Sequence, residues 1–335
     1  MQYTVLGKTG LKISRMGFGG IPIQKIDAEG TKKLMLSLLD AGINYIDTAR
    51  GYTVSEEYLG FALEGIRQHF VLATKSMSRD RDAMARDIDI SLKNLRTDYI
   101  DLYQVHNPGL ADLEKVCAPG GALEALLEAK NAGKIGHIGV TVHTLDVFEA
   151  ALELPWVETI MFPYNIVETQ GEALIRRCRD KNIGFICMKP LAGGAIDDAT
   201  LALRFVMQNP DVTVVIPGMA EEVELAQNIA AVSDASPLTP GELEKIQAIR
   251  DSLGTQFCRR CNYCAPCTVG IPISGVFMME GYLSRYGLED WARARYDGFA
   301  KTASDCIGCG VCETRCPYKL PIREMLQRAV KTFGK

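Results

Sequence analysis

The chain has 335 residues, of which 47% are hydrophobic, and its net charge is −4, with 37 Lys and Arg against 41 Asp and Glu. This length is enough for one large and one small domain, and the composition is typical of globular proteins. Nucleic acid is not expected as a partner, because the sequence has no long basic run and no interleaved basic and aromatic residues. No membrane span is expected either, since no apolar stretch is long enough to cross a bilayer.

The chain begins with a predicted β-hairpin. Two short extended runs, Tyr3–Val5 and Lys12–Ile13, flank the turn sequence Gly7-Lys8-Thr9-Gly10. The first residues lack the charged segment followed by an apolar segment that marks a secretory signal. We therefore expect a cytoplasmic protein whose first element is this hairpin.

From Ser14 to about Val232, short β-rich apolar runs alternate with amphipathic helical patterns. The expected strands are Met16–Phe18, Tyr45–Asp47, Phe70–Lys75, Leu102–His106, His137–Thr141, Thr159–Phe162, Gly184–Met188 and Val212–Ile216. The expected helices are Thr31–Ala41, Ser55–Leu63, Asp82–Leu95, Gly121–Ala132, Leu145–Leu154, Glu172–Lys181, Ala199–Asn209 and Glu222–Val232. Eight β-α units predict an α/β fold, a (β/α)8 TIM barrel with the hairpin at its bottom, although alternation alone leaves a doubly wound sheet open.

A break with helix-start residues, Ser236–Pro240, follows the barrel pattern. A helix over Gly241–Leu253 then leads towards a group of cysteines, and we place the domain boundary near Asp251. The expected domains are a barrel over residues 1–250 and a smaller domain over residues 251–335.

Eight of the eleven cysteines fall into two tightly spaced runs in the second domain. The runs are Cys258, Cys261, Cys264 and Cys267, and then Cys306, Cys309, Cys312 and Cys316. Three cysteines at i, i+3 and i+6 suit a [4Fe-4S] cluster, and the fourth cysteine of such a run usually ligates the other cluster. Two [4Fe-4S] clusters are therefore expected, one held by Cys258, Cys261, Cys264 and Cys316 and the other by Cys306, Cys309, Cys312 and Cys267.

The second run matches the bacterial ferredoxin pattern through Pro317, whereas the first has one residue fewer before Cys267 and then Thr268 in place of proline. Structural zinc and disulfides are the alternatives. Zinc prefers two separated cysteine pairs, and disulfide scaffolds are small and rich in cysteine throughout. Helical patterns over Val276–Tyr286 and Glu289–Phe299 between the runs predict an α-helical ferredoxin-like domain. Cluster-forming free thiols again indicate the reducing cytoplasm.

Polar residues end three successive strands of the expected barrel, where the chemistry of this fold is expected. Asp47 and Tyr52 follow the second strand, Lys75 ends the third and His106 ends the fourth. A charged Lys75 held by Asp47 is expected to make the Tyr52 phenol a stronger acid. Tyr52 then gives a proton to a carbonyl oxygen as a hydride reaches the carbon, while His106 orients that oxygen. Each residue alone also has a structural explanation, such as a helix cap or a core partner.

At these residues the chain resembles the aldo-keto reductases, over residues 1 to about 250. The resemblance is carried by the motifs Gly17-Phe18-Gly19-Gly20, Asp47-Thr48-Ala49-Arg50-Gly51-Tyr52, Lys75, His106 and Ile216-Pro217-Gly218 followed by Asn228. With the cysteine runs, the chain is similar to the iron-sulfur branch of that family, which carries a dicluster domain after the barrel. The resemblance implies an NADP(H)-linked carbonyl reductase whose catalytic tetrad is Asp47, Tyr52, Lys75 and His106.

The positions that hold the nucleotide in that family differ in this chain. Thr141-Val142 stands where the family commonly has Ser-Asn, and Met161 where it has Gln. Met188 and Lys189 replace an aromatic and a small polar residue, and Gly218 and Glu224 occupy positions that often carry the Lys and Arg for the 2′-phosphate. The expected cofactor-binding residues are Thr141, Asn165, Lys189, Pro217, Gly218 and Asn228. NADP(H), NAD(H) and a flavin all stay open as the cofactor.

The leading hypothesis is an oxidoreductase that reduces a small carbonyl or related unsaturated compound and is coupled to both clusters, with ferredoxin or another electron carrier as partner. The alternative is a redox-sensing or regulatory nucleotide-binding protein without turnover. The intact Tyr52 and Lys75 favour the enzyme, and the altered nicotinamide contacts favour the sensor. A third possibility is that the clusters only stabilise an ordinary reductase.

Overall fold

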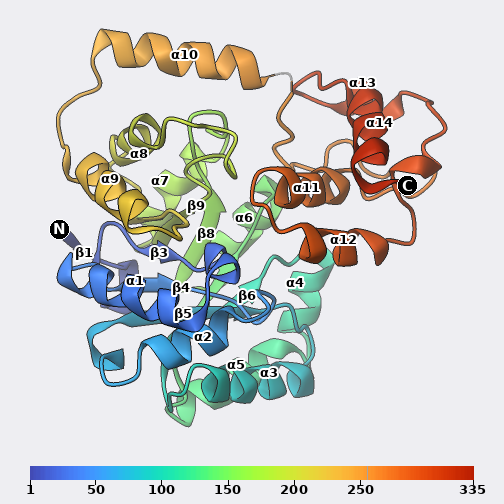
Figure 1. Cartoon of the computed structure of the whole chain (residues 1–335). Helices are drawn as coiled ribbons and strands as arrows, with labels where there is room; N and C mark the ends of the chain where they lie inside the picture. Colours follow the sequence, from blue (N-terminus) through green and yellow to red (C-terminus); the bar gives the residue numbers. More distant parts are fainter. Residues whose placement is uncertain (255) are drawn as a thin grey trace. The chain divides into compact units, whose positions relative to one another are not determined.

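The structure, a computed structural model, describes residues 1–254 and 256–335, which form two compact units (Figure 1). The first unit consists of Met1–Asn165, Thr169–Pro190 and Asp198–Leu238, and the second of Ile166–Glu168, Leu191–Asp197 and Thr239–Lys335. The domain boundary expected near Asp251 falls inside the second unit, within helix α10 (Pro240–Gly254).

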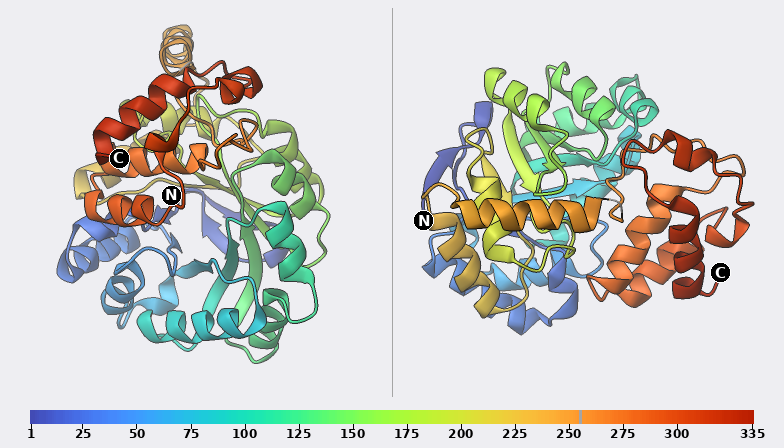
Figure 2. Two further views of the ribbon diagram at one scale, coloured as in Figure 1. Left: turned by 90° about the vertical axis from the view of Figure 1, so that its right-hand side faces the viewer. Right: turned by 90° about the horizontal axis from the view of Figure 1, so that it is seen from above.

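Eight parallel strands in the first unit form a closed barrel. They are β3 (Phe18–Gly19), β4 (Tyr45–Asp47), β5 (Val71–Ser76), β6 (Ile100–His106), β7 (Ile135–Thr141), β8 (Thr159–Pro163), β9 (Gly184–Met188) and β10 (Val214–Ile216). Strands that follow one another in the chain are neighbours in the sheet, and bridges from Met16 to Val215 and from Gly19 to Gly218 join its two edges. Figure 2 shows the strands surrounded by helices. The predicted (β/α)8 barrel is therefore confirmed, and the doubly wound sheet is excluded.

Nine helices accompany these strands in the described part of the first unit. They are α1 (Ala28–Asp40), α2 (Ser55–Ala62), α3 (Arg81–Asn94), α4 (Leu110–Cys117), α5 (Ala122–Asn131), α6 (Leu145–Leu152), α7 (Glu172–Asp180), α8 (Ala199–Met207) and α9 (Glu222–Ser233). The sequence pattern did not predict α4, because this helix is only eight residues long and directly follows the turn sequence Pro108-Gly109. Across the described residues, no helix is both long and apolar enough to cross a lipid bilayer.

The predicted N-terminal hairpin is present and lies at the end of the barrel where the strands begin. Strands β1 (Tyr3–Val5) and β2 (Lys12–Ser14) pair in antiparallel fashion. The side chain of Leu6 is fully buried among apolar residues of the barrel interior. The backbone N–H of Lys8 donates to the carbonyl oxygen of Asn182, just before β9, at 2.7 Å. The hairpin thus closes the barrel at its bottom, as expected.

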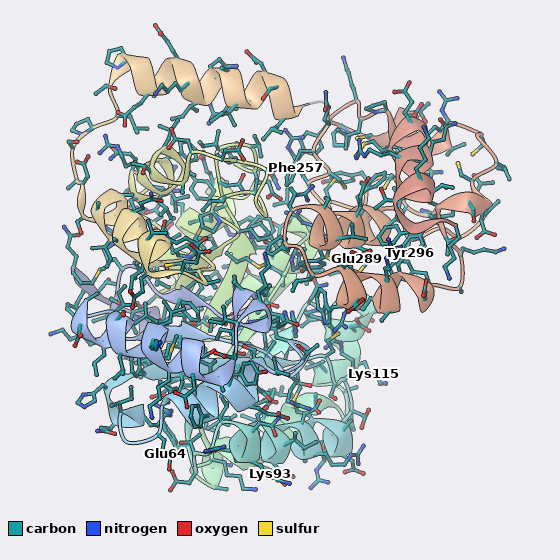
Figure 3. The ribbon with its side chains drawn as sticks, viewed as in Figure 1. Glu64, Lys93, Lys115, Phe257, Glu289 and Tyr296 are labelled. Atoms are coloured by element: carbon teal, nitrogen blue, oxygen red, sulfur yellow. The ribbon has the colours of Figure 1, made fainter. Side chains whose placement is uncertain are left out.

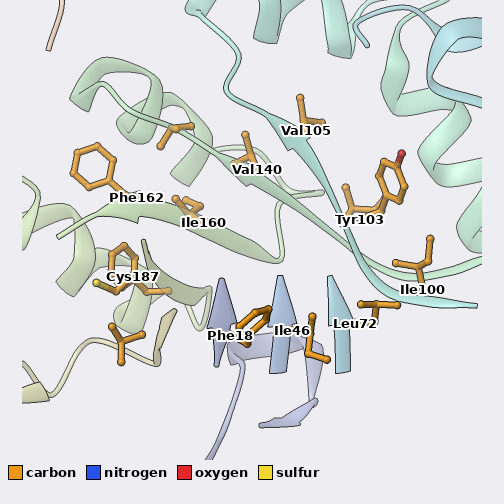
Figure 4. Packing of buried hydrophobic residues seen from close by; sticks show 14 of the residues in the cluster. Phe18, Ile46, Leu72, Ile100, Tyr103, Val105, Val140, Ile160, Phe162 and Cys187 are labelled. Atoms are coloured by element: carbon orange, nitrogen blue, oxygen red, sulfur yellow. The ribbon is translucent and has the colours of Figure 1, made fainter. Parts of the chain in front are cut away.

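The strands bury both faces, which is usual for parallel sheets. One set of side chains packs against the surrounding helices, and it includes Phe18, Ile46, Leu72, Val105, Val140, Ile160 and Phe162 (Figure 4). The alternate set, which includes Tyr45, Ala73 and Leu102, fills the barrel interior. Since side chains alternate with a period of two, the next inward position on each of these three strands lies two residues further on, near the strand end.

The described part of the second unit consists of helices and loops without a strand, and it has its own hydrophobic core. Its helices are α10, α11 (Ile273–Ser284), α12 (Glu289–Asp297), α13 (Val311–Arg315) and α14 (Ile322–Phe333). Glu289 and Tyr296 lie on α12 (Figure 3). The ring of Tyr296 stacks on that of Phe333, with centroids 3.9 Å apart, which joins α12 to α14. The predicted α-helical C-terminal domain is confirmed, although the sequence analysis did not predict α13 and α14 as separate helices.

Helices α2 and α3 of the first unit meet at Gly60, where no side chain fits. A Cβ atom at this position would lie 2.1 Å from the carbonyl oxygen of Asn94 and 2.8 Å from the carbonyl carbon of Leu95. Both neighbours are backbone atoms, so they cannot rotate away as a flexible side chain could. The close approach also places buried Glu56 of α2 within 2.8 Å of the Ser91 hydroxyl on α3.

We expect Gly60→Ala to lower the free energy of unfolding by about 1–3 kcal/mol, the usual cost of overpacking. Urea unfolding followed by circular dichroism measures this. Gly241→Ala in α10 is the control, because an added Cβ there meets no atom within 4 Å and a helical Gly-to-Ala change is neutral or slightly stabilising. An unchanged midpoint for Gly60→Ala would contradict the close packing of α2 on α3.

Candidate functional sites

Three polar side chains share the inner face of the barrel near the carboxyl ends of neighbouring strands: Asp47 of β4, Lys75 of β5 and Gln104 of β6. Each lies two residues after an inward-facing apolar residue, so the strand period brings all three to the same face. The Nζ atom of Lys75 forms an ion pair with Oδ2 of Asp47 and donates to the carbonyl oxygen of Thr48 at 2.7 Å. Gln104 donates from Nε2 to the other carboxylate oxygen of Asp47 at 3.0 Å. Both carboxylate oxygens of Asp47 therefore have a partner, Lys75 for Oδ2 and Gln104 for Oδ1.

This ion pair is almost completely enclosed, with Asp47 3% and Lys75 1% exposed. Burial raises the pKa of Asp47, and the nearby Lys75 opposes that rise. Burial lowers the pKa of Lys75, and Asp47 opposes that fall. Because a single buried charge is far more costly than a paired one, each group keeps the other ionised. The ammonium group is thereby fixed in position.

Tyr52 and His106 lie next to this pair. The Nζ atom of Lys75 is 4.9 Å from the centroid of the Tyr52 ring. The rings of Tyr52 and His106 meet edge to face, with centroids 6.0 Å apart and an interplanar angle of 86°. Both residues are only partly buried, so a small molecule can reach them. The structure thus brings the four predicted catalytic residues together at one end of the barrel.

The loop that carries Tyr52 is held by an ion pair behind it. Arg50 donates to Glu56 at 2.6 Å, and the carboxylate of Glu56 also accepts from the Thr74 hydroxyl at 2.7 Å. Within the loop, the N–H of Tyr52 donates to the carbonyl oxygen of Ala49 at 3.0 Å. Arg50 therefore fixes the loop to α2 through Glu56, and Glu56 in turn joins α2 to the outer face of β5 through Thr74.

Three of the expected nucleotide-binding residues follow or end neighbouring strands. Thr141 ends β7 opposite His106, and its hydroxyl accepts from the N–H of Asn107 at 3.0 Å. Asn165, fully buried after β8, donates from Nδ2 to the carbonyl oxygen of Lys189 at 2.9 Å. Lys189 follows β9 with a left-handed backbone at φ 55°. These residues lie at the carboxyl ends of β7, β8 and β9, the side on which the tetrad also lies.

The other three expected residues follow β10. Pro217 is buried and Gly218 is exposed, while Asn228 is 5% exposed on α9. A Cβ atom at Gly218 would lie 2.8 Å from Cγ of Pro22, so a side chain would be crowded there. The backbone of Gly218 is exposed, so a nucleotide could approach it closely. The residues present therefore fit a bound nucleotide.

Glu224 already bonds the backbone donors at the start of α9. Its Oε2 atom accepts from the N–H groups of Ala220 at 2.7 Å and Glu221 at 3.0 Å. This carboxylate accepts the hydrogen bonds of both N–H groups, and it places a negative charge at the start of the helix. A further phosphate at this place would be repelled.

The cysteines of the first run lie close to one another and to Cys316. Burial raises the pKa of Cys264 to about 12, and the neighbouring Cys258 and Cys261 add to the rise. Burial also raises the pKa of Cys261, with a further contribution from Cys316. Thiols at such close quarters ionise together only against a positive centre, which iron would supply.

The first three cysteines of the second run line a cavity together with Cys267 of the first run. Cys267, Cys306, Cys309 and Cys312 all face this cavity, whose other walls include Ile273 and Leu326. Gly308 and Gly310 have left-handed backbones, at φ 70° and 76°, which let the chain curl around the cavity between the cysteines. The chemistry and grouping of these donors fit a [4Fe-4S] cluster, in the crossed arrangement that the spacing predicts.

Disulfides and single metal ions fit these cysteines less well. All eleven cysteines, each of which the structure describes, are free thiols. In the ranges 1–254 and 256–335, no group of three or more His, Cys, Asp or Glu side chains is arranged to hold one metal ion. A tetrahedral zinc needs its four ligands at about 2.3 Å from one centre.

Two features of these sites were not predicted. Gln104 was missed as a partner of Asp47, although its place two residues before His106 on the inward face of β6 could have identified it. The buried ion pair between Glu168 and Arg260 was also missed. The two residues are far apart in sequence, and no local pattern joins them.

Comparison with known proteins finds a family for each part of the chain. Residues 15–201 match the aldo/keto reductase family, and residues 257–321 match a 4Fe-4S dicluster domain. L-galactose dehydrogenase from Arabidopsis thaliana is 26% identical over 74% of this chain and 94% of its own length. Aldo-keto reductase YhdN from Bacillus subtilis (strain 168) is 33% identical over 60% of this chain and 66% of its own.

Solved structures of aldo-keto reductases have a similar fold. The solved structure of an aldo-keto reductase from Bacillus halodurans in its holo form is 26% identical, with a TM-score of 0.64. It covers 74% of this chain, and the match spans 96% of that protein. Since the family match alone spans more than half of the chain, this protein belongs to the aldo/keto reductase family of oxidoreductases and carries a 4Fe-4S dicluster domain at its C-terminal end.

Proposed function

We propose that this protein reduces a small carbonyl compound with a nicotinamide nucleotide, and that two [4Fe-4S] clusters connect the reaction to a one-electron carrier such as ferredoxin. One observation carries the proposal. The buried Asp47–Lys75 pair holds an ammonium group 4.9 Å from the ring of a partly exposed tyrosine, beside His106. This is the arrangement that an acid-assisted carbonyl reduction needs.

Each residue of the tetrad has a defined role in this proposal. The nucleotide, when bound, supplies a hydride to the carbonyl carbon. Tyr52 donates its hydroxyl proton to the carbonyl oxygen, so that an alcohol forms. Lys75, kept charged by Asp47, stabilises the phenolate left on Tyr52. His106 donates a hydrogen bond to the oxygen and stabilises the negative charge that develops on it.

The nucleotide would be held by Thr141, Asn165, Lys189, Pro217, Gly218 and Asn228. Glu224 supports NAD(H) over NADP(H), because its carboxylate bonds the N–H groups at the start of α9 and repels a 2′-phosphate there. Met161 and Met188 belong to the apolar cluster inside the barrel, so they would contact the nicotinamide through dispersion alone.

In the C-terminal domain, one cluster would be held by Cys258, Cys261, Cys264 and Cys316, and the other by Cys306, Cys309, Cys312 and Cys267. Clusters of this type supply one-electron transfer. Because they form only from free thiolates, we place the protein in the reducing cytoplasm.

Tyr52→Phe tests the acid role, since it removes the proton donor and leaves the ring. We expect kcat/KM for carbonyl reduction to fall by about a hundredfold or more, the usual contribution of a general acid, with unchanged iron content. Tyr58→Phe, the same change on a partly buried tyrosine of α2, should leave the rate unchanged. Full activity in Tyr52→Phe would favour the redox-sensing alternative.

The metal content tests the cluster assignment. Anaerobically purified protein should contain about eight iron and eight sulfide per chain, as two [4Fe-4S] clusters require. Cys267→Ala should lose or convert one cluster, whereas Cys117→Ala, on an exposed cysteine of α4, should lose none. Stoichiometric zinc without iron would refute the assignment, and full iron in Cys267→Ala would show that another group is the fourth ligand.

Glu224→Gln tests the nucleotide preference. Glutamine can keep the capping hydrogen bonds but removes the charge. We expect kcat/KM with NADPH to rise by about tenfold, equivalent to about 1.4 kcal/mol, while the value with NADH stays constant. Glu222→Gln, on the exposed residue of α9 that accepts from Ser37 at 3.0 Å, is the control. A wild-type preference for NADPH would contradict this interpretation of Glu224.

A further inference from the structure

Arg260 and Glu168 form a buried ion pair next to the first cysteine run. Arg260 is 9% exposed and Glu168 is fully buried, and both belong to the second unit. The guanidinium binds the Glu168 carboxylate through one terminal nitrogen. Through the other it donates to the carbonyl oxygen of Cys258 at 3.4 Å. The charge of Arg260 is thus located between Glu168 and a predicted cluster ligand.

The backbone of Arg260 contacts the same cysteine. Its N–H donates to the Sγ atom of Cys258 at 3.4 Å, and its left-handed conformation, with φ at 57°, belongs to the turn between Cys258 and Cys261. A hydrogen bond to a ligand sulfur is one of the factors that set the reduction potential of an iron-sulfur cluster. Arg260 therefore acts on Cys258 through both its main chain and its charge.

Stability alone does not explain this pair. Desolvating two charges costs several kcal/mol per ion, and well-packed apolar residues in their place are often as stable. The Nε atom of Arg260 is also buried without a hydrogen-bond partner among the residues that the structure describes. Since this burial has a cost, the pair points to a role that a hydrophobic contact could not perform.

Such a role follows from the charge of a reduced cluster. One-electron reduction adds a negative charge to a centre already held by four thiolates, so a nearby cation stabilises the reduced form. The negative charge of Glu168 would destabilise the reduced form. Arg260 is the member of the pair that contacts Cys258, while Glu168 contacts Arg260, so the positive end of the pair is the nearer one.

The second site has a different environment. Cys309 is exposed, and its Sγ atom lies 3.4 Å from the Thr268 hydroxyl. Arg323 lines this site, but its side chain is 50% exposed and pairs with Glu313 at 2.8 Å. Water and salt screen such an exposed charge far more than a buried one. The nearest cation would therefore stabilise added negative charge more strongly at the first site than at the second.

We propose that Arg260 is a positioning residue for the first cluster and raises its reduction potential above the value that the same cysteines would give without the buried charge. The inference rests on the two clusters proposed above. If the potential is raised in this way, an electron that enters the domain resides preferentially on the cluster at Cys258. The exposed cluster at Cys309 then exchanges electrons with a partner.

The test is a redox titration of the full-length, anaerobically prepared protein with dithionite, followed by electron paramagnetic resonance. Arg260→Gln should lower one of the two midpoint potentials, by 59 mV for a tenfold change in a one-electron equilibrium. Glu168→Gln should raise the same potential. Arg260→Lys, which keeps the charge, should stay closer to the wild type than Arg260→Gln does. Opposite shifts cannot come from general damage to the fold.

Arg293→Gln is the matched control, because it removes the same charge from a pair on α12 in which Arg293 is 40% and Glu289 62% exposed. It should move neither potential. Full iron content with unchanged potentials, or shifts of the same sign in Arg260→Gln and Glu168→Gln, would overturn the inference and leave the clusters in place. If Arg260→Gln loses a cluster, Glu168→Gln decides: a raised potential supports the inference, and an unchanged or lowered one overturns it. Protein without iron would overturn the clusters and the inference together, before any titration.

Discussion

The active end of the barrel depends on the buried ion pair between Lys75 and Asp47. A lysine that is 1% exposed stays charged only if a carboxylate and polar acceptors surround it, and here Asp47 and the carbonyl oxygen of Thr48 do so. Gln104 in turn occupies the second oxygen of Asp47. All of these groups come from strand ends, whose positions the closed barrel fixes. Tyr52, the proposed proton donor on a more exposed loop, therefore lies beside a cation that is fixed in place.

The sequence predicted most of this barrel because each strand is short, apolar and followed by an amphipathic helix, and those are local properties. It also predicted that Asp47, Tyr52, Lys75 and His106 lie together, since polar residues at strand ends stand out against apolar runs. It missed Gln104, which the strand period places on the inward face but whose partner is set by the register that pairs it with Lys75 across β5 and β6. Nor did it predict α4, whose two buried residues, Leu113 and Val116, are too few to produce a clear periodicity.

In the cysteine domain, too, the sequence predicted the features that depend on neighbouring residues and missed those that depend on distant ones. Spacing within each run is local, and it predicted which cysteines group together; the cavity lined by Cys267, Cys306, Cys309 and Cys312 has that grouping. The pair of Glu168 and Arg260 joins positions 92 residues apart. Glu168 lies outside every motif of the sequence, and Arg260 occupies a position between two cysteines that the ferredoxin spacing leaves unspecified. Only the folded chain shows that they meet.

The two buried ion pairs, one in each unit, follow the same physical logic. In the function proposed above, each pair places a cation, Lys75 or Arg260, beside a group that would gain negative charge. These groups are the phenol of Tyr52, when it gives up its proton, and the cluster proposed at Cys258, when it accepts an electron. Out of contact with water, such a cation acts more strongly than a surface charge, and the carboxylate behind it keeps it ionised. Asn165 at the candidate nucleotide site and Glu168 are three residues apart in the chain. The segment of chain that carries one partner of the Arg260 pair is thus continuous in sequence with one of the residues proposed to hold the nucleotide.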